Sequence, residues 1–190
     1  MKQLNLDEIV NMNKSELIIL TEKVLSGKKV IMINILNETL KRNLPTIFFS
    51  LELSMEEVIK KIYYNKSNLF LQNKSYIESI INNCREIKSK VDIKLVMKDG
   101  LYDIKTKEAY FLGQGDIISI IIKQLKELSQ ELNVTILITA PSNISIDEFK
   151  RNYIEVLNYF CKGEKAKDFV DKIILVNEEK LIIKTLRSYE

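Results

Sequence analysis

A chain of 190 residues, 46% of them hydrophobic, has the size of one domain and enough apolar side chains for a sizeable core. Its net charge is only +3, because 26 acidic residues nearly balance 29 basic ones, so a nucleic-acid ligand is permitted but not indicated. The sequence contains no histidine, which excludes every His-based catalytic triad and removes the commonest metal ligand. No metal site is predicted.

The two cysteines, Cys84 and Cys161, stand far apart and form no CxxC pair. Buried free thiols in a reducing compartment are therefore expected rather than a disulfide. No apolar run approaches the roughly 18 residues that a membrane span requires. The charged N-terminal residues also do not resemble a signal peptide. These features together predict a cytoplasmic protein without a membrane partner.

Short apolar runs alternate with longer helical patterns along the chain. Strands are predicted at Glu16–Leu20, Thr46–Ser50, Ile93–Met97, Val134–Ala140 and Asp171–Val176. Helices are predicted at Lys29–Asn43, Ser54–Asn65, Ser75–Lys90, Asp116–Asn133 and Ser145–Gly163. Two of these helices open with a capping box, formed by Ser54 with Glu57 and by Ser145 with Glu148. Near the C-terminus, Ile173–Leu186 reads as two strands with a tight polar turn, which predicts an antiparallel hairpin.

The near-continuous hydrophobicity of the strands suits a mostly parallel sheet with helices on both faces. No repeat and no Pro/Gly/Ser-rich linker divides the chain, so residues 1–190 are expected to form a single α/β domain. Ligands of such sheets bind at the carboxyl ends of the strands. The segments that follow Leu20, Ser50, Met97 and Ala140 are therefore the candidate functional segments.

The first of these segments, TEKVLSGKK, contains part of a phosphate-binding loop. A GxxxxGK[ST] loop wraps backbone N–H groups around phosphates, places a lysine on them and gives Mg²⁺ a hydroxyl ligand. Gly27 and Lys28 match its Gly-Lys pair, but Glu22 occupies the first glycine position and Lys29 the hydroxyl position. Glu22 adds a charge and a side chain where backbone must approach phosphate, whereas the Lys29 ammonium can partly replace the charge of Mg²⁺. A nucleotide-binding loop and an ordinary strand–helix turn both fit this segment.

The next three strand ends carry one candidate position each. Glu52 stands where NTPases orient an attacking water, although an acid before a helix N-terminus is also favoured by the helix dipole. Asp99 stands where P-loop proteins hold a Mg²⁺-bound water, but Lys98 breaks the apolar run and Asp99-Gly100 also suits a turn. Pro141 follows the fourth strand and lacks the long polar side chain that would sense a γ-phosphate.

Taken in order, these segments resemble the RecA-fold motor domain of DnaB-type replicative helicases. The matching stretches are SELIIL, GKK, FFSLELSMEEVIKKI, LVMKDGL and LKELSQELNVTILIT. The resemblance covers Leu4 to about Val176 and implies a RecA-like three-layer sandwich. It also implies that Lys28 is the phosphate lysine, Glu52 the catalytic glutamate and Asp99 the Walker B aspartate.

The sequence departs from the pattern of that family at several functional positions. Arg187 lies near the family's lysine-x-arginine finger, but Thr185 stands where the lysine is expected. Within residues 1–190 we expect no counterpart of the family's N-terminal domain, its linker helix or most of its DNA-channel loop. The replaced positions are Glu22 and Lys29 in the Walker A loop, and Pro141 and Ile144 in the segment after the fourth strand. We therefore interpret the loop as a degenerate Walker A motif.

Three functions remain open from the sequence. The first is a non-catalytic homologue with vestigial Glu52 and Asp99, which acts in DNA replication by contacting a replicative helicase or another replication protein. The second is an ATP-dependent helicase core that retains nucleotide binding at Gly27, Lys28 and Lys29. The third is a RecA-like ATPase with altered chemistry around its changed Walker A loop.

The helicase alternative implies further ligands. It requires ATP with Mg²⁺, oligomerisation into a ring, and single-stranded DNA in a central channel. Asp103–Asp116 and Phe149–Tyr153 mix basic and aromatic residues, as single-strand binders do. Solvated surface is the other interpretation of both segments.

Overall fold

The computed structural model describes residue 9 and residues 15–23, 28–107, 113–142, 144–151, 155–156, 158, 160, 168–177 and 180–185. Its strands are β1 (Leu17–Lys23), β2 (Thr46–Phe49), β3 (Leu69–Gln72), β4 (Leu95–Lys98), β5 (Thr135–Ser142), β6 (Lys172–Asn177) and β7 (Lys180–Thr185). Its helices are α2 (Lys28–Lys41), α3 (Met55–Lys60), α4 (Ile77–Lys88), α5 (Gln114–Leu132) and α6 (Ile146–Arg151), with short 3-10 helices η1 (Lys66–Asn68) and η2 (Leu101–Asp103). In this described part, no helix is long and apolar enough to cross a membrane.

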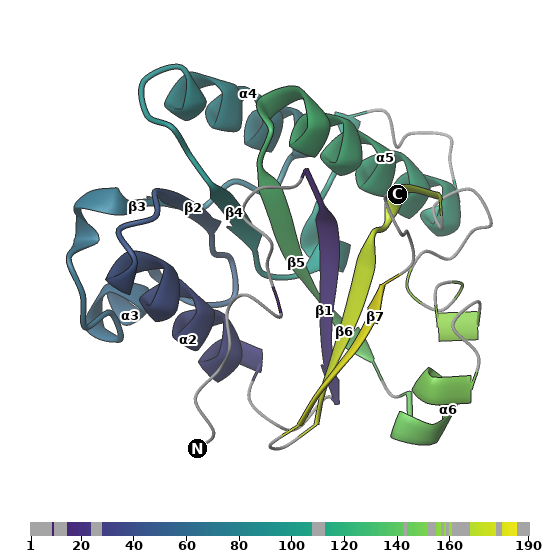
Figure 1. The fold of residues 1–190 in the computed structure, drawn as a ribbon. Coiled ribbons are helices and arrows are strands. Elements are labelled where there is room, and N and C mark those ends of the chain that lie inside the picture. Colours follow the sequence, from purple (N-terminus) through teal and green to yellow (C-terminus); the bar gives the residue numbers. More distant parts are fainter. Residues whose placement is uncertain are drawn as a thin grey trace.

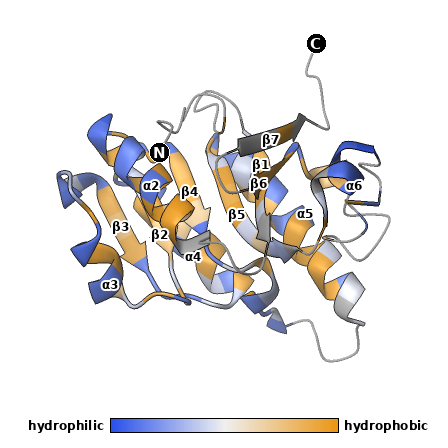
Figure 2. Ribbon diagram, turned by 90° about the horizontal axis from the view of Figure 1, so that it is seen from below, coloured by the Kyte–Doolittle hydropathy of each residue, from blue (hydrophilic) through white to orange (hydrophobic). Residues whose placement is uncertain are grey.

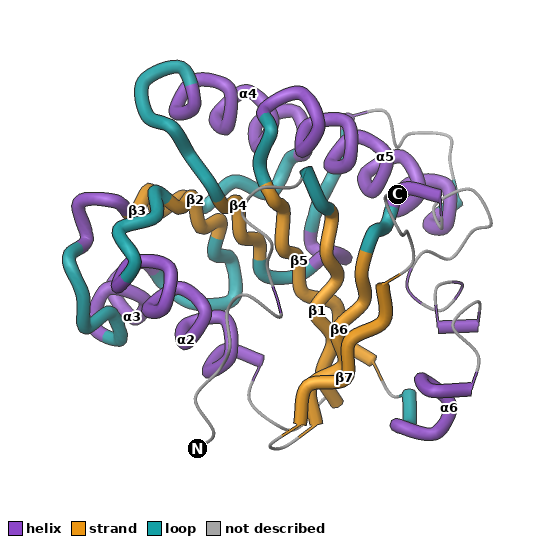
Figure 3. Tube along the Cα trace, in the orientation of Figure 1, coloured by secondary structure: helices purple, strands orange, loops and turns teal. Residues whose placement is uncertain are grey.

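The strands form one sheet in the order β3-β2-β4-β5-β1-β6-β7 (Figures 1 and 3). Every neighbouring pair from β3 to β6 is parallel. β7 pairs with β6 in the antiparallel direction, and the residues that join the two strands lie outside the described ranges. The predicted mostly parallel α/β sheet is confirmed. Because β5 lies between β1 and β4, the first and third candidate segments are separated by one strand.

Both faces of the sheet are buried, and β1 shows how. Successive side chains of a strand point to opposite faces. Leu17 and Ile19 accordingly belong to a core cluster that includes side chains of α4 and α5, whereas Ile18 and Leu20 belong to a second cluster with α2 and α3. Figures 1 and 2 show these helix pairs on opposite faces of the largely hydrophobic strands. Burial on both sides, worth about 1.5–3 kcal/mol for each large aliphatic side chain, explains why the strands read as continuous apolar runs.

One strand was not predicted. β3 is four residues long, all half-buried, and pairs only with β2 at the edge of the sheet. Its sequence, LFLQ, is only four residues long and contains no β-branched residue. The pairing with β2, rather than local preference, therefore stabilises β3.

The helix predicted over Ser54–Asn65 was too long. α3 ends at Lys60, and its N-terminus has the predicted capping box between Ser54 and Glu57. Asn65 starts a separate element, because its side chain accepts a hydrogen bond from the Ser67 backbone and caps η1. The second predicted capping box is also present: the Ser145 backbone donates to Glu148, and the Glu148 backbone donates back to the Ser145 hydroxyl.

A buried ion pair joins α5 to the amino-terminal end of β1. Lys126 Nζ lies 2.7 Å from Asp171 Oδ2 and also donates to the Ser15 carbonyl at 2.7 Å. Asp171 accepts a hydrogen bond from the Leu17 backbone through the same oxygen, at 2.7 Å. Both charged side chains are almost fully buried. Mutual pairing and extra hydrogen bonds are what such a pair needs to offset its desolvation.

The expectation of a buried free thiol is confirmed for one cysteine. Cys84 lies on α4 within the core, and burial raises its pKa to about 12. A thiol with so high a pKa is almost entirely protonated at neutral pH and therefore a poor nucleophile. Cys161 lies outside the described residues.

We expect Lys126→Met to destabilise the fold by about 3–5 kcal/mol, because Asp171 would remain as an unpaired buried charge. The measurement is the free energy of unfolding from urea titration. Lys123→Met is the matched control on the same helix. Its ion pair with Glu127 is 3.7 Å long and more than half exposed, so its loss should cost no more than about 1 kcal/mol. Equal costs for the two substitutions would contradict a structural role for the buried pair.

Candidate functional site

Asp99 lies where the carboxyl ends of β2 and β4 meet. Its carboxylate accepts hydrogen bonds from the Ser50 hydroxyl at 2.9 Å and from the backbone N–H groups of Leu51 at 2.8 Å and Glu52 at 3.1 Å. The Asp99 backbone N–H in turn donates to the Phe49 carbonyl. These contacts join the end of β2 to the end of β4 through one largely buried side chain.

Lys98 supplies the charge that accompanies Asp99. Its Nζ lies 3.1 Å from Asp99 Oδ1, donates to the Asp99 carbonyl, and belongs to a side chain that is only 1% exposed. In the sheet, Lys98 pairs with Phe49 on β2 and Ile138 on β5. Burial lowers the pKa of Lys98, while the charges of Asp99, Asp103 and Glu52 oppose that shift. The ammonium is thus held inside the protein next to acidic groups.

The hydrogen-bond donors around Asp99 limit the room that its carboxylate has for a divalent cation. A carboxylate offers about four lone-pair directions, and here four donor groups, including an ammonium, already approach its two oxygens. A Mg²⁺ ion or its bound water at Asp99 would have to displace these donors and face the Lys98 charge. The residues around Asp99 therefore do not fit the Mg²⁺ site that the sequence resemblance implies.

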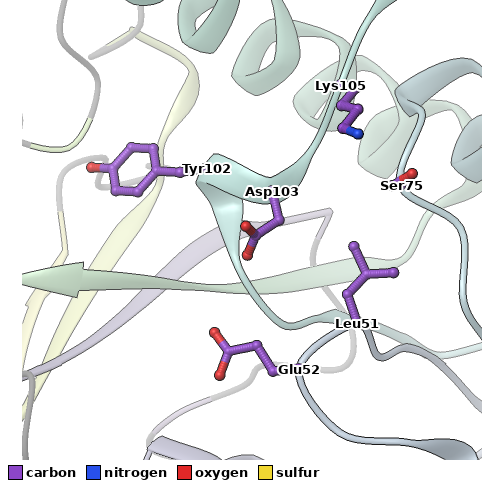
Figure 4. Close-up of a pocket in the computed structure, with 6 residues that line it drawn as sticks. All are labelled: Leu51, Glu52, Ser75, Tyr102, Asp103 and Lys105. Atoms are coloured by element: carbon purple, nitrogen blue, oxygen red, sulfur yellow. The ribbon is translucent and has the colours of Figure 1, made fainter.

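Glu52 is exposed and lines a pocket beside η2 (Figure 4). The pocket has a volume of about 380 Å³. Its lining comes from the end of β2, from the segment before α4 and from the segment after β4. The lining residues are Leu51, Glu52, Ser75, Tyr102, Asp103 and Lys105. The structure thus places Glu52 next to Asp99, through the hydrogen bond from the Glu52 backbone, and adds a pocket beside them.

The segment between β1 and α2 is described only at its two ends, since residues 24–27 lie outside the described ranges. β1 continues to Lys23, and Glu22 is paired in register with Pro141 on β5 and Val176 on β6. Sheet pairing therefore continues through the position of the first Walker A glycine. Lys28 and Lys29 are the first two residues of α2, so their backbone N–H groups lie at a helix N-terminus. Gly27 lies outside the described residues.

The structure describes three of the four remaining predicted positions. Pro141 is half-buried on β5, and Ile144 packs against the core cluster of α4 and α5. Thr185 ends β7, while Arg187 lies outside the described residues. The structure thus does not describe the candidate arginine finger.

One segment with a predicted role in DNA binding needs correction. Phe149 is fully buried in the core and lies within α6, so it cannot stack on a nucleic-acid base. The segment Phe149–Tyr153 therefore loses the aromatic residue nearest its basic side chains. Of Asp103–Asp116, the described ends carry η2 and the start of α5, and residues 108–112 lie outside the described ranges.

Sequence reasoning missed the pairing of Lys98 with Asp99 and the contribution of Asp103. A lysine that interrupts a buried apolar strand was the available signal for Lys98. No local signal marks Asp103, because its place beside Glu52 depends on the turn at Gly100, where φ is 74°.

No protein-family model matches the sequence, and no curated protein matches it either. Two solved structures match in three dimensions. A solved ATPase domain superposes with a TM-score of 0.71 at 17% identity, covering 90% of this chain and 73% of that one. A DnaB-like replicative helicase, solved in a study of its interactions with primase, superposes with a TM-score of 0.70 at 16% identity, covering 88% of this chain and 48% of that one. The chain thus has the RecA-like fold of DnaB-like helicase ATPase domains and spans about half of the helicase chain.

We expect Gly100→Ala to destabilise the protein by about 1–3 kcal/mol, because a positive φ strains any residue with a side chain. A Cβ atom at this position would also collide with the Asp103 carboxylate. Gly113→Ala is the control for urea titration. Gly113 has an ordinary φ of −66°, and its added Cβ would lie 3.6 Å from the nearest atom, on Asp116. The control should cost less than about 1 kcal/mol, and an equal loss in both variants would show that the turn is not strained.

Proposed function

We propose that this chain is a non-catalytic, DnaB helicase-like RecA-fold domain that acts in DNA replication by contacting another protein. We take residues 1–190 as a single domain. The observation that carries the proposal is the state of Asp99, whose carboxylate is paired with the buried Lys98 ammonium and bonded by three groups of the β2 end. An acid occupied in this way is not available to hold a Mg²⁺-bound water.

The Walker A segment supports the same proposal. Glu22 is paired within β1 at the position of the first glycine, and Lys29 replaces the hydroxyl ligand of Mg²⁺. Removing one well-placed charge-stabilising group typically costs about 2.7–4 kcal/mol of transition-state stabilisation. Several such groups of one reaction are changed here. Losses within one site are not additive, yet even two of them would reduce hydrolysis by orders of magnitude. Glu52 and Asp99 are then vestigial.

Weak nucleotide binding without hydrolysis is compatible with this site. α2 still begins at Lys28, and a helix N-terminus attracts phosphate through its free N–H groups and its dipole. A nucleotide bound there by Gly27, Lys28 and Lys29 would need no divalent cation, because the lysine charges are part of the chain. ATP is thus a weak candidate ligand rather than a required cofactor.

The second candidate is an ATP-dependent helicase core. The fold itself favours it, together with the exposed position of Glu52 after β2. This function would require a ring oligomer, Mg²⁺ at Asp99, single-stranded DNA and an arginine finger such as Arg187. The arrangement around Asp99 argues against the Mg²⁺ requirement, which is why we prefer the non-catalytic role.

Calorimetric titration of ATP and ADP, with and without Mg²⁺, tests the proposal. We expect weak or undetectable binding that Mg²⁺ does not strengthen, together with no hydrolysis above the buffer rate. Lys28→Ala should abolish any binding that is detected, because it removes the ammonium group that would contact the phosphates at the start of α2. Lys41→Ala, in the last turn of the same helix, is the control and should leave binding unchanged. Micromolar, Mg²⁺-dependent binding with hydrolysis that Glu52→Gln removes would establish the helicase alternative instead.

The proposed protein partner needs a separate test. A purified replicative helicase from the same cell is the first partner to try, by co-purification and by sedimentation of the mixture. We expect a complex that forms without added nucleotide. If neither the helicase nor any other replication protein binds, a role in replication through protein contact is wrong.

A further inference from the structure

The sheet ends at β3 on one side, and the outer edge of this strand carries backbone groups that β2 does not use (Figure 1). The Gln72 carbonyl accepts a hydrogen bond from the Ser50 backbone, so Gln72 directs its backbone groups toward β2. Successive residues of a strand direct their N–H and C=O groups to opposite sides. Leu71 therefore directs both groups outward, and among the described strands β3 pairs with β2 alone. An edge of this kind is a template for a further strand.

The side chains of this edge are apolar and only half covered. Leu69 and Leu71 pack against the core cluster of α2 and α3, whereas Phe70 packs against the cluster of α4 and α5. All of β3 is half-buried, and Figure 2 shows the strand as hydrophobic. Its four residues include neither the proline nor the charged side chain by which edge strands commonly block pairing. A short strand laid along β3 would cover apolar surface on both faces, because its own side chains also alternate.

Lys66 brings a positive charge to the amino-terminal end of this edge. It lies in η1, directly before β3, and its side chain is exposed. Within the described part of the chain Lys66 forms no ion pair. The nearest acids along the sequence are Glu57, nine residues before it, and Glu78, twelve residues after it. Both are engaged: Glu57 closes the capping box of α3, and Glu78 accepts hydrogen bonds from the segment after η2.

Neighbouring elements do not neutralise this charge. The Asn68 side chain donates to the Asn43 carbonyl, which places η1 beside the end of α2. The last turn of α2 is itself basic, and its acid, Glu38, already pairs with Lys41. Before β4, Asp92 is held between two lysines at 2.8 Å and 2.6 Å. The amino-terminal end of the edge therefore favours an acidic group on whatever pairs with β3.

We infer that β3 accepts an extended segment of the partner protein as an additional edge strand, with apolar side chains along Leu69–Leu71 and an acidic residue next to Lys66. Main-chain hydrogen bonds give strand addition its affinity, and the side chains give it specificity. The outward N–H and C=O of Leu71 select a peptide over a nucleic acid, because a peptide backbone presents a matching acceptor and donor at strand spacing. The inference rests on the proposed function in protein contact and names the chemistry of the partner segment.

The first test compares three peptides of equal length. The parent is N-acetyl-Glu-Glu-Val-Leu-Val-Glu-Glu-amide. The second carries N-methyl groups on the leucine and on the valine after it, which removes one donor from each edge of the peptide strand but keeps every side chain. The third has lysine in place of each glutamate. Each is titrated into the ¹⁵N-labelled full chain by NMR, and we expect the parent to bind about tenfold more tightly than either of the others.

Hydrogen exchange in the same sample reports on the direction of the backbone groups. In the free chain the amides of Phe70 and Gln72, which face β2, should exchange slowly, and that of Leu71 should exchange fast. The parent peptide at saturation should slow exchange at Leu71 about tenfold, because its N–H gains an acceptor. Unchanged exchange at Leu71 in the saturated complex would show that the peptide does not pair with β3.

Three protein variants separate backbone pairing from charge. Leu71→Pro removes the outward N–H and should abolish binding, since edge strands accommodate proline where the N–H faces solvent. Lys66→Gln changes only an exposed side chain and should weaken the parent peptide about threefold. Lys123→Gln, at a more than half-exposed position on α5, is the matched control and should bind like the wild type.

Further outcomes would overturn the inference. Absence of binding by the parent peptide, or equal affinity for its N-methylated form, would mean that no strand adds to β3. Displacement of the parent peptide by oligothymidylate would assign the edge to nucleic acid. Self-association that is detected by sedimentation and lost in Leu71→Pro would assign it to a second copy of the chain. Co-purification with a replication protein that persists in Leu71→Pro would reject this surface but leave the proposed function standing, so the two failures are distinguishable.

Discussion

The arrangement of the candidate site depends on the carboxylate of Asp99. This side chain accepts hydrogen bonds from Ser50, Leu51 and Glu52 at the end of β2 and pairs with Lys98 on β4. Hydrogen bonds to a charged group contribute about 1.5–3 kcal/mol each, and together they offset the desolvation of the two charges. The backbone of Glu52, and with it one wall of the neighbouring pocket, takes its position from this contact.

A parallel sheet brings its strand ends together whatever chemistry they carry. In this chain the ends of β2 and β4 carry acids, and Lys98 brings a positive charge to them from within the protein. The ends of β2 and β4 are therefore joined to each other by the Lys98–Asp99 ion pair and by hydrogen bonds to Asp99.

Most of the fold could be predicted because it depends on local patterns. Strands that are buried on both faces are apolar throughout, and capping boxes mark helix starts such as Ser54 and Ser145. The errors arose where pairing with another strand decides the outcome. β3 forms because β2 offers it an edge, and β1 extends to Lys23 because β5 and β6 flank it on both sides. Neither partner is visible from the local sequence.

The sequence by itself determined the alternation of strands and helices, the mostly parallel sheet and the order of the candidate segments, since apolar periodicity and turn chemistry act over a few residues. Only the tertiary structure decided which charges meet. Lys98 and Asp99 are neighbours whose side chains would point to opposite faces within a strand, yet they pair because β4 ends at Lys98 and the chain turns at Gly100. Lys126 and Asp171 meet across 45 residues. Such pairings depend on the packing of distant elements, and packing has no local signature.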